Sequence, residues 1–245
     1  MEYIYEPPKK LLFTSGKGGV GKSTLSVSFA KLLSQRGNRV LLVDFDMALR
    51  TLDIMLGVGN MVLYDWYDVI DGRCTPSQAI LSSDRGPDLL AAPPDRPYFD
   101  NSSVEWLINQ YEDSYDYIIL DSPAGVGRGF EAASCTAGFA FVVSTPDIVC
   151  VRSAEVAGEK LEKAGIETRL LINRFERKRV NKGRLLNIDE TIDRTGMQLI
   201  GVVPDDDRLS ERTQQGLPLD GRRKSTRAME RIIDRFLGED VPLKV

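Results

Sequence analysis

The chain has 245 residues, of which 42% are hydrophobic and 28% are charged, and its formal net charge is −4. This size and balance predict a globular domain with a sizeable core and argue against a surface built throughout to coat nucleic acid. There is no histidine, so the commonest general base and metal ligand is missing, and the three separated cysteines predict neither a disulfide framework nor a zinc site.

The first ten residues form a polar lead without an apolar signal segment. No run in the sequence approaches the ~18 apolar residues of a membrane span. We therefore expect one α/β domain over residues 1–245, located in the cytoplasm.

A glycine-rich turn follows the apolar run Leu11–Phe13 and reads G-x-x-x-x-G-K-S. This spacing is typical of a phosphate-binding loop, in which glycines let backbone N–H groups converge on phosphate oxygens at the start of a helix. Lys22 would reach the β- and γ-phosphates of a nucleotide, and the Ser23 hydroxyl would ligate Mg²⁺. The alternative is a turn of the same shape without a ligand. The predicted binding segment comprises Gly16, Lys17, Gly18, Gly19, Val20, Gly21, Lys22, Ser23 and Thr24.

The next elements alternate between helix and strand. Helical spacing over 23–36 is followed by the continuous apolar run 40–43, which is typical of a strand buried on both faces. That strand ends in Asp44 and Asp46, whose carboxylates could serve Mg²⁺ or an attacking water. Asp44 could instead only cap the end of the strand.

The middle of the chain continues the pattern. We expect helices within 64–70, over 76–81 and over 103–111, a weak strand over 88–92, and a surface loop over 93–101. The apolar run 117–120 ends in Asp121, which would hold Mg²⁺ through a water molecule. A glycine-bearing loop over 122–127 follows.

The last third predicts strands over 139–144, 169–173 and 199–205, with helices over 149–164 and 207–215. A helix over 226–237 has one apolar stripe and a polar face of mixed charge, which favours docking on the core over lying on a membrane. Two basic clusters could contact DNA phosphates, although a solvated surface is the preferred interpretation. The clusters are Arg174, Arg177, Lys178, Arg179, Lys182 and Arg184, and Arg222, Arg223, Lys224 and Arg227.

Two runs carry a family resemblance: K-G-G-V-G-K-S from Lys17 and D-S-P-A-G from Asp121. Both resemble the deviant phosphate-loop ATPases of the MinD/ParA family, and the second is similar to its MinD branch. The resemblance implies a doubly wound, mostly parallel sheet with helices on both faces. It also implies a Mg²⁺-dependent, slow and partner-stimulated ATP hydrolase that forms a homodimer when ATP is bound.

The resemblance assigns roles to individual residues. Lys17 would reach the partner's nucleotide across the dimer, and Asp46 would orient the attacking water. Gly125 would belong to the loop that senses the γ-phosphate. Asn173 would lie near the adenine, with Pro204 and Asp205 bordering the base.

The MinD branch implies a role in placing the division septum, with a division inhibitor and a MinE-like activator as partners. A ParA-like DNA segregation ATPase, a regulator of flagellar number and a nucleotide-binding scaffold without turnover remain alternatives, although DNA is not expected as a partner. An iron–sulfur role is not expected, because Cys135 has no partner motif near the loop. Many MinD-like chains continue into a basic amphipathic helix, so peripheral attachment to the inner face of the membrane would need an extension beyond Val245.

Overall fold

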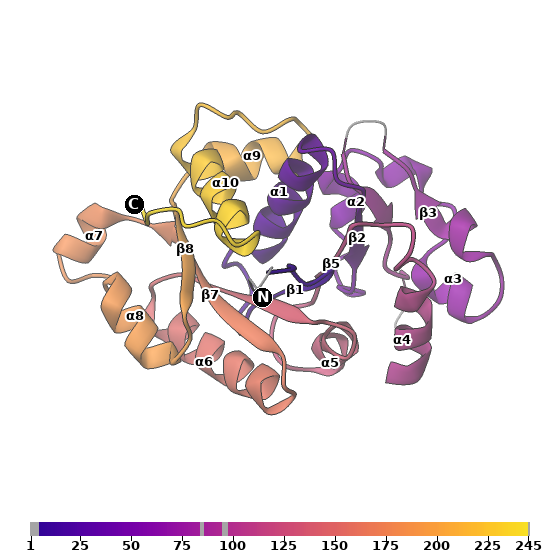
Figure 1. Ribbon diagram of the computed structural model, residues 1–245, viewed down its shortest axis with the longest axis horizontal. Helices are drawn as coiled ribbons and strands as arrows, with labels where there is room; N and C mark the ends of the chain where they lie inside the picture. Colours follow the sequence, from indigo (N-terminus) through magenta and orange to yellow (C-terminus); the bar gives the residue numbers. More distant parts are fainter. Residues whose placement is uncertain (1–4, 84–85, 95–97, 245) are drawn as a thin grey trace.

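The computed structural model describes residues 5–83, 86–94 and 98–244, and these contain one eight-stranded sheet (Figure 1). The strand order is β3-β4-β2-β5-β1-β6-β7-β8, and each neighbouring pair is parallel except β3 with β4. The predicted fold class is therefore confirmed. The strands are β1 Lys10–Thr14, β2 Val40–Asp44, β3 Ile80–Leu81, β4 Asp88–Leu90, β5 Tyr117–Asp121, β6 Phe139–Ser144, β7 Glu167–Phe175 and β8 Leu199–Pro204.

Helices cover both faces of this sheet (Figure 1). The α-helices are α1 Lys22–Gln35, α2 Leu52–Met55, α3 Trp66–Ile70, α4 Asn101–Asn109, α5 Arg128–Ser134, α6 Ile148–Lys163, α7 Arg177–Asn181, α8 Ile188–Thr195, α9 Asp207–Gln214 and α10 Lys224–Phe236. Two short 3₁₀ segments, η1 Gly59–Met61 and η2 Pro76–Ala79, complete the described elements.

The core has two layers because successive strand residues point to opposite faces of the sheet. Leu11 and Phe13 of β1 pack with α1 and α10, while Leu12 packs with the layer that contains α4, α5 and α6. Phe29 and Phe236 meet in the first layer with their ring centroids 5.8 Å apart. The strands in the middle of the sheet are buried on both faces, which explains why their sequences are continuously apolar rather than alternating.

Several predicted boundaries were wrong. The helix expected over 76–81 is η2 followed by β3, since Ile80 and Leu81 pair antiparallel with β4 at the edge of the sheet. The expected loop over 93–101 gives way to α4 at Asn101, where Asp100 caps the helix, and residues 95–97 of that loop lie outside the described residues. Residues 1–4 of the polar lead also lie outside them, and β1 already begins at Lys10.

The structure contains helices that the sequence analysis did not predict, among them α5, α7 and α8. For α8 a signal was present: Asn187 and Glu190 form a reciprocal capping box, and Gly196 ends the helix in the left-handed conformation. Within the described ranges no helix is long and apolar enough to cross a membrane.

Candidate nucleotide-binding site

The predicted phosphate loop joins β1 to α1 at the carboxyl edge of the sheet, and two of its glycines have backbone conformations that favour glycine. Gly19 and Gly21 have φ angles of 82° and 89°. At Gly16 the constraint is space, because a Cβ atom would lie 1.9 Å from the backbone oxygen of Ser153 in α6. The glycines therefore serve both the turn and its close approach to a neighbouring helix.

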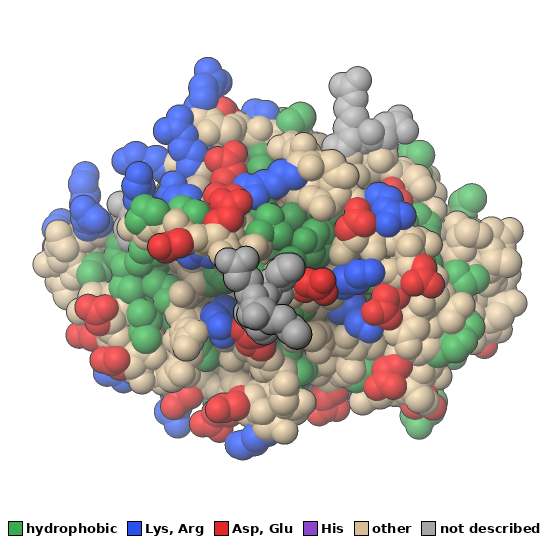
Figure 2. Space-filling model, viewed as in Figure 1, with side chains coloured by type: hydrophobic (Ala, Val, Ile, Leu, Met, Phe, Trp, Pro, Cys, Tyr) green, Lys and Arg blue, Asp and Glu red, His purple; other side chains and the backbone are tan. Residues whose placement is uncertain are grey.

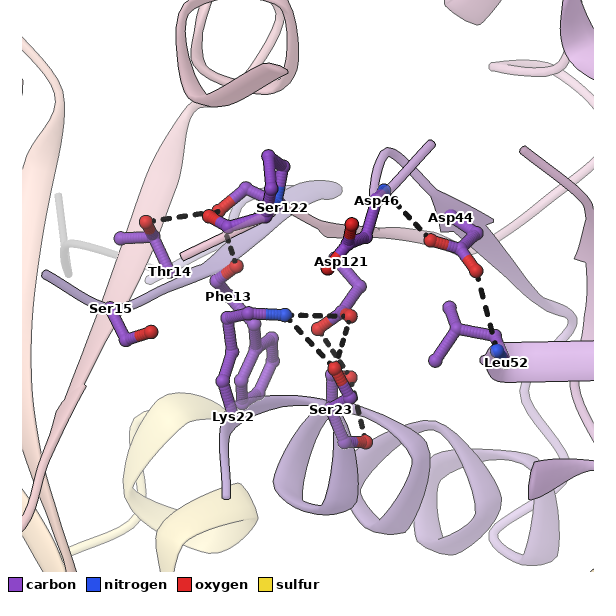
Figure 3. A network of polar contacts seen from close by, with 12 residues as sticks. Phe13, Thr14, Ser15, Lys22, Ser23, Asp44, Asp46, Leu52, Asp121 and Ser122 are labelled. Atoms are coloured by element: carbon purple, nitrogen blue, oxygen red, sulfur yellow. Dashed lines mark hydrogen bonds and ion pairs between the residues drawn. The ribbon is translucent and has the colours of Figure 1, made fainter. Parts of the chain in front are cut away.

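Lys22 and Ser23, at the end of this loop, form a polar cluster with Asp121 (Figure 3). Lys22 Nζ lies 2.8 Å from Asp121 Oδ2, and the Ser23 hydroxyl donates to the same oxygen at 2.7 Å. Ser26, one turn further along α1, donates to the other carboxylate oxygen at 2.8 Å. Residues 99 positions apart thus meet, because β1 and β5 are adjacent and both end at this edge.

Asp44 lies on β2 directly beside Asp121 in the strand register, and its side chain is buried. Its Oδ1 accepts the N–H of Asp46 at 2.8 Å and its Oδ2 accepts the N–H of Leu52 at 3.3 Å (Figure 3). Burial, and next the charge of Asp121, raise the pKa of Asp44 to about 7. These backbone contacts favour the interpretation of Asp44 as a strand-end cap, and its Mg²⁺ role stays a prediction.

Asp46 and Lys17 are more accessible than the buried cluster. The Asp46 side chain accepts the N–H groups of Ala48 and Leu49, both at 3.2 Å, and is partly exposed. Lys17 is exposed on the surface of the phosphate loop, whereas Lys22 in the same loop is buried. The two lysines therefore occupy different environments, as two different roles would require.

The loop after β5 is tied to the phosphate loop by hydrogen bonds. Gly125 N–H donates to the carbonyl of Ser15 at 2.8 Å, and the Ser122 hydroxyl lies 3.0 Å from the Thr14 hydroxyl. Gly125 has a φ of 86°, which favours glycine at this position. These contacts hold the loop after β5 beside the two residues that lead into the phosphate loop.

The residues predicted to surround the base also come together. Asn173, Pro204 and Asp205 line a small cavity with Gly21 and Thr24. Asn173 is buried, and its Nδ2 donates to the carbonyl of Val20 at 2.8 Å. Its amide nitrogen therefore supports the phosphate loop. The amide oxygen of Asn173 does not take part in this hydrogen bond, and its contact with a base remains a prediction.

Residues 11–219 match the model of the CobQ/CobB/MinD/ParA nucleotide binding domain. The chain is 37% identical to the septum site-determining protein MinD of Bacillus subtilis, covering 96% of this chain and 91% of that protein. It belongs to the MinD/ParA family. It is also 39% identical to the Helicobacter pylori protein of the same name, covering 93% of this chain and 90% of that protein.

Solved structures of MinD proteins share the fold. The chain superposes on MinD in the MinC:MinD cell division protein complex of Aquifex aeolicus with a TM-score of 0.89 at 33% identity, covering 96% of this chain and 98% of that chain. MinD of Pyrococcus horikoshii, complexed with Mg-ADP, gives a TM-score of 0.82 at 26% identity, covering 92% and 94% of the two chains.

A member of the MinD/ParA family is expected to hold Mg²⁺, and the donor set here fits that ion. Ser23, Asp121 and Asp44 offer hydroxyl and carboxylate oxygens, the hard ligands that Mg²⁺ prefers (Figure 3). The described residues contain no group of three or more His, Cys, Asp or Glu side chains able to hold a metal alone.

Arg174 lines the small cavity predicted to hold the base, whereas its place in a basic cluster of the sequence predicts only a surface cation. It has a φ of 51°, at a point where the pairing of β7 with β8 shifts register. A left-handed arginine leaves no signal in the sequence, because the strain is set by how the two strands meet.

Proposed function

We propose that this protein binds ATP with Mg²⁺, hydrolyses it slowly, and forms a face-to-face homodimer while ATP is bound. The observation that carries the proposal is the pair of lysines in one glycine turn: Lys22 is buried beside Asp121, and Lys17 is exposed. A buried lysine serves the chain's own nucleotide. An exposed one is free to serve the nucleotide of a second copy.

Exposed apolar side chains at the edge of the sheet that carries the phosphate loop support such a dimer. Leu49, Ile148 and Val149 lie after β2 and β6, at the same edge of the sheet as the phosphate loop, and they are 70%, 55% and 55% exposed. Large apolar side chains exposed at one edge are typical of a surface that is covered in an assembly.

The chemistry follows from these positions. Lys22 would exchange Asp121 for the β- and γ-phosphates of the substrate, and Ser23 and Asp121 would hold Mg²⁺. When bound, Mg²⁺ neutralises charge on those phosphates. Asp46 would orient a water whose oxygen bonds to the γ-phosphorus as the bond to the bridging oxygen breaks, and the proton leaves to solvent. We expect slow turnover, because the chain has no histidine, no other strong base is present at this step, and Asp46 can only orient and weakly activate the water.

The cellular task that these properties fit is placement of the division septum, the role named for the relatives. The MinC:MinD structure supports a division inhibitor as partner, and we propose a MinE-like activator of hydrolysis. DNA segregation remains the alternative. The similar plasmid partition proteins are only 20–22% identical and share the fold alone.

The experiment compares light scattering after size-exclusion chromatography, with Mg-ATP, for three variants. Lys17→Ala should bind ATP but stay monomeric, and Asp46→Ala should accumulate as an ATP-bound dimer. Lys163→Ala, which removes an exposed lysine at the end of α6, is the matched control. A Lys17→Ala protein that pairs and hydrolyses ATP like the wild type would rule out the dimer-switch proposal.

A further inference from the structure

A groove of about 740 Å³ lies between the β7–α7 segment and α10, beside the nucleotide site rather than in it. Its lining joins the two basic clusters of the sequence, one from α7 and one from the start of α10. Figure 2 shows Lys and Arg side chains gathered over this part of the surface. The cations of the lining are Arg177, Lys178, Lys224, Arg227, Arg231 and Lys244.

This positive charge is poorly compensated. The lining contains two acids, Glu176 and Asp205, and Glu176 pairs with Arg179 outside the lining. In the described part of the chain, no ion pair within 4.0 Å involves any of the six lining cations. In a protein with a net charge of −4, such a concentration of unpaired cations indicates an anionic ligand.

Two of the arginines are held in place. Arg227 Nε donates to the carbonyl of Gly221 at 3.2 Å, and Arg231 Nη2 donates to that of Lys244 at 3.1 Å. The remaining N–H groups of each guanidinium are available, and their planar arrangement matches the oxygens of a phosphate group. The floor of the groove includes Phe175 and Pro204, so the lining combines apolar surface with cations, as in small-molecule sites of this volume.

The charge pattern favours a compact ligand over an extended one. Two acids, Glu176 and Asp205, stand in the lining itself among the six cations. A nucleic-acid backbone, with a phosphate charge about every 3.4 Å along a strand, would place phosphates beside these acids as well as beside the cations. A compact molecule can turn its phosphates toward the cations and away from the two acids.

We propose that this groove binds a compact small molecule that carries two or more phosphate groups. Pro204 and Asp205 line both this groove and the cavity predicted to hold the base. A ligand bound in the groove should therefore change the protein's affinity for ADP. Bound ADP should change the protein's affinity for the groove ligand by the same factor. This coupling rests on the proposed function, whereas binding in the groove does not.

The test is calorimetric titration of inorganic tripolyphosphate into protein saturated with Mg-ADP, whose own binding is measured first. Lys224→Glu and Lys224→Gln should each weaken tripolyphosphate binding, the first at least tenfold. Lys163→Glu makes the same charge change on the distant end of α6 and should have no such effect. Both positions are exposed, and unfolding curves of each of the three variants check that folding is unchanged.

Four results separate the possibilities. A loss of tripolyphosphate affinity that is confined to the Lys224 variants supports the site, and it does so whether or not the protein is found to bind Mg-ADP. Equal binding by all variants, or no binding at millimolar tripolyphosphate, overturns it. The protein is also tested for binding to a 30-base-pair DNA duplex and to anionic vesicles. If either binds and millimolar tripolyphosphate does not displace it, the proposal is overturned in favour of an extended polyanion as ligand.

Discussion

Replacing Lys22 by alanine removes the ammonium group that lies 2.8 Å from Asp121, at a point where both side chains are buried. Breaking a buried ion pair from one side costs about 3–5 kcal/mol, because the remaining charge stays buried without its partner. In this variant two serine hydroxyls still donate to Asp121, so we expect the lower end, about 3 kcal/mol. For a chain of this size, Tm should fall by about 6–12 °C.

The assay is urea unfolding of the nucleotide-free protein for Lys22→Ala, Asp121→Asn and the double variant. Removing both partners relieves the unpaired charge, so the double variant should lose less than the sum of the single losses, by about 2 kcal/mol. Strict additivity, or a single variant as stable as the wild type, would refute the reasoning about this pair. Lys22→Ala should also lose ATP binding, and micromolar affinity in that variant would contradict the assignment of the loop.

Three further outcomes are expected. Gly16→Ala should abolish ATP binding, because its Cβ would lie 1.9 Å from the Ser153 carbonyl oxygen; Gly127→Ala, with nothing within 4 Å, should bind ATP normally in the same titration. Asp206→Ala removes the cap of α9 and an ion pair to the residue preceding α10, so denaturant unfolding should show a loss of about 1–2 kcal/mol, most of it from the cap because the arginine of the ion pair is exposed. A loss under about 0.5 kcal/mol would count against these contacts. Burial raises the pKa of Cys135 to about 11. The rate of its alkylation by iodoacetamide, measured by peptide mass analysis, should therefore rise about tenfold per pH unit from pH 7 to 10. A rate that levels off near pH 9 would contradict this.

The strands and the phosphate loop were predictable because their signals are local. A continuous apolar run followed by an acid or a glycine turn needs no knowledge of the rest of the chain, and β1, β2 and β5 each show that pattern. The edge strand β3 was missed for the opposite reason. Two residues form a strand only because β4 lies beside them, and their own sequence does not distinguish strand from helix.

The candidate site likewise combines features that were predictable from local sequence with features that depend on tertiary neighbours. Sequence spacing identified Lys22, Ser23 and Asp121 as candidates, but only the adjacency of β1 and β5 brings them within hydrogen-bonding distance. The position of Asn173 in the chain predicts a contact with the base but gives no sign of its hydrogen bond to Val20. Packing decides that its amide nitrogen faces the Val20 carbonyl, because β7 passes beside the phosphate loop.

By itself the sequence determined the phosphate loop, its two lysines and the acids that end β2 and β5, because each depends on residues close together in the chain. Only the tertiary structure decided which lysine is buried, that Asp44 is shielded enough to raise its pKa, and that two basic clusters become one groove. The physical reason is that burial and charge density depend on every segment that packs nearby, and sequence neighbours supply only a few of these.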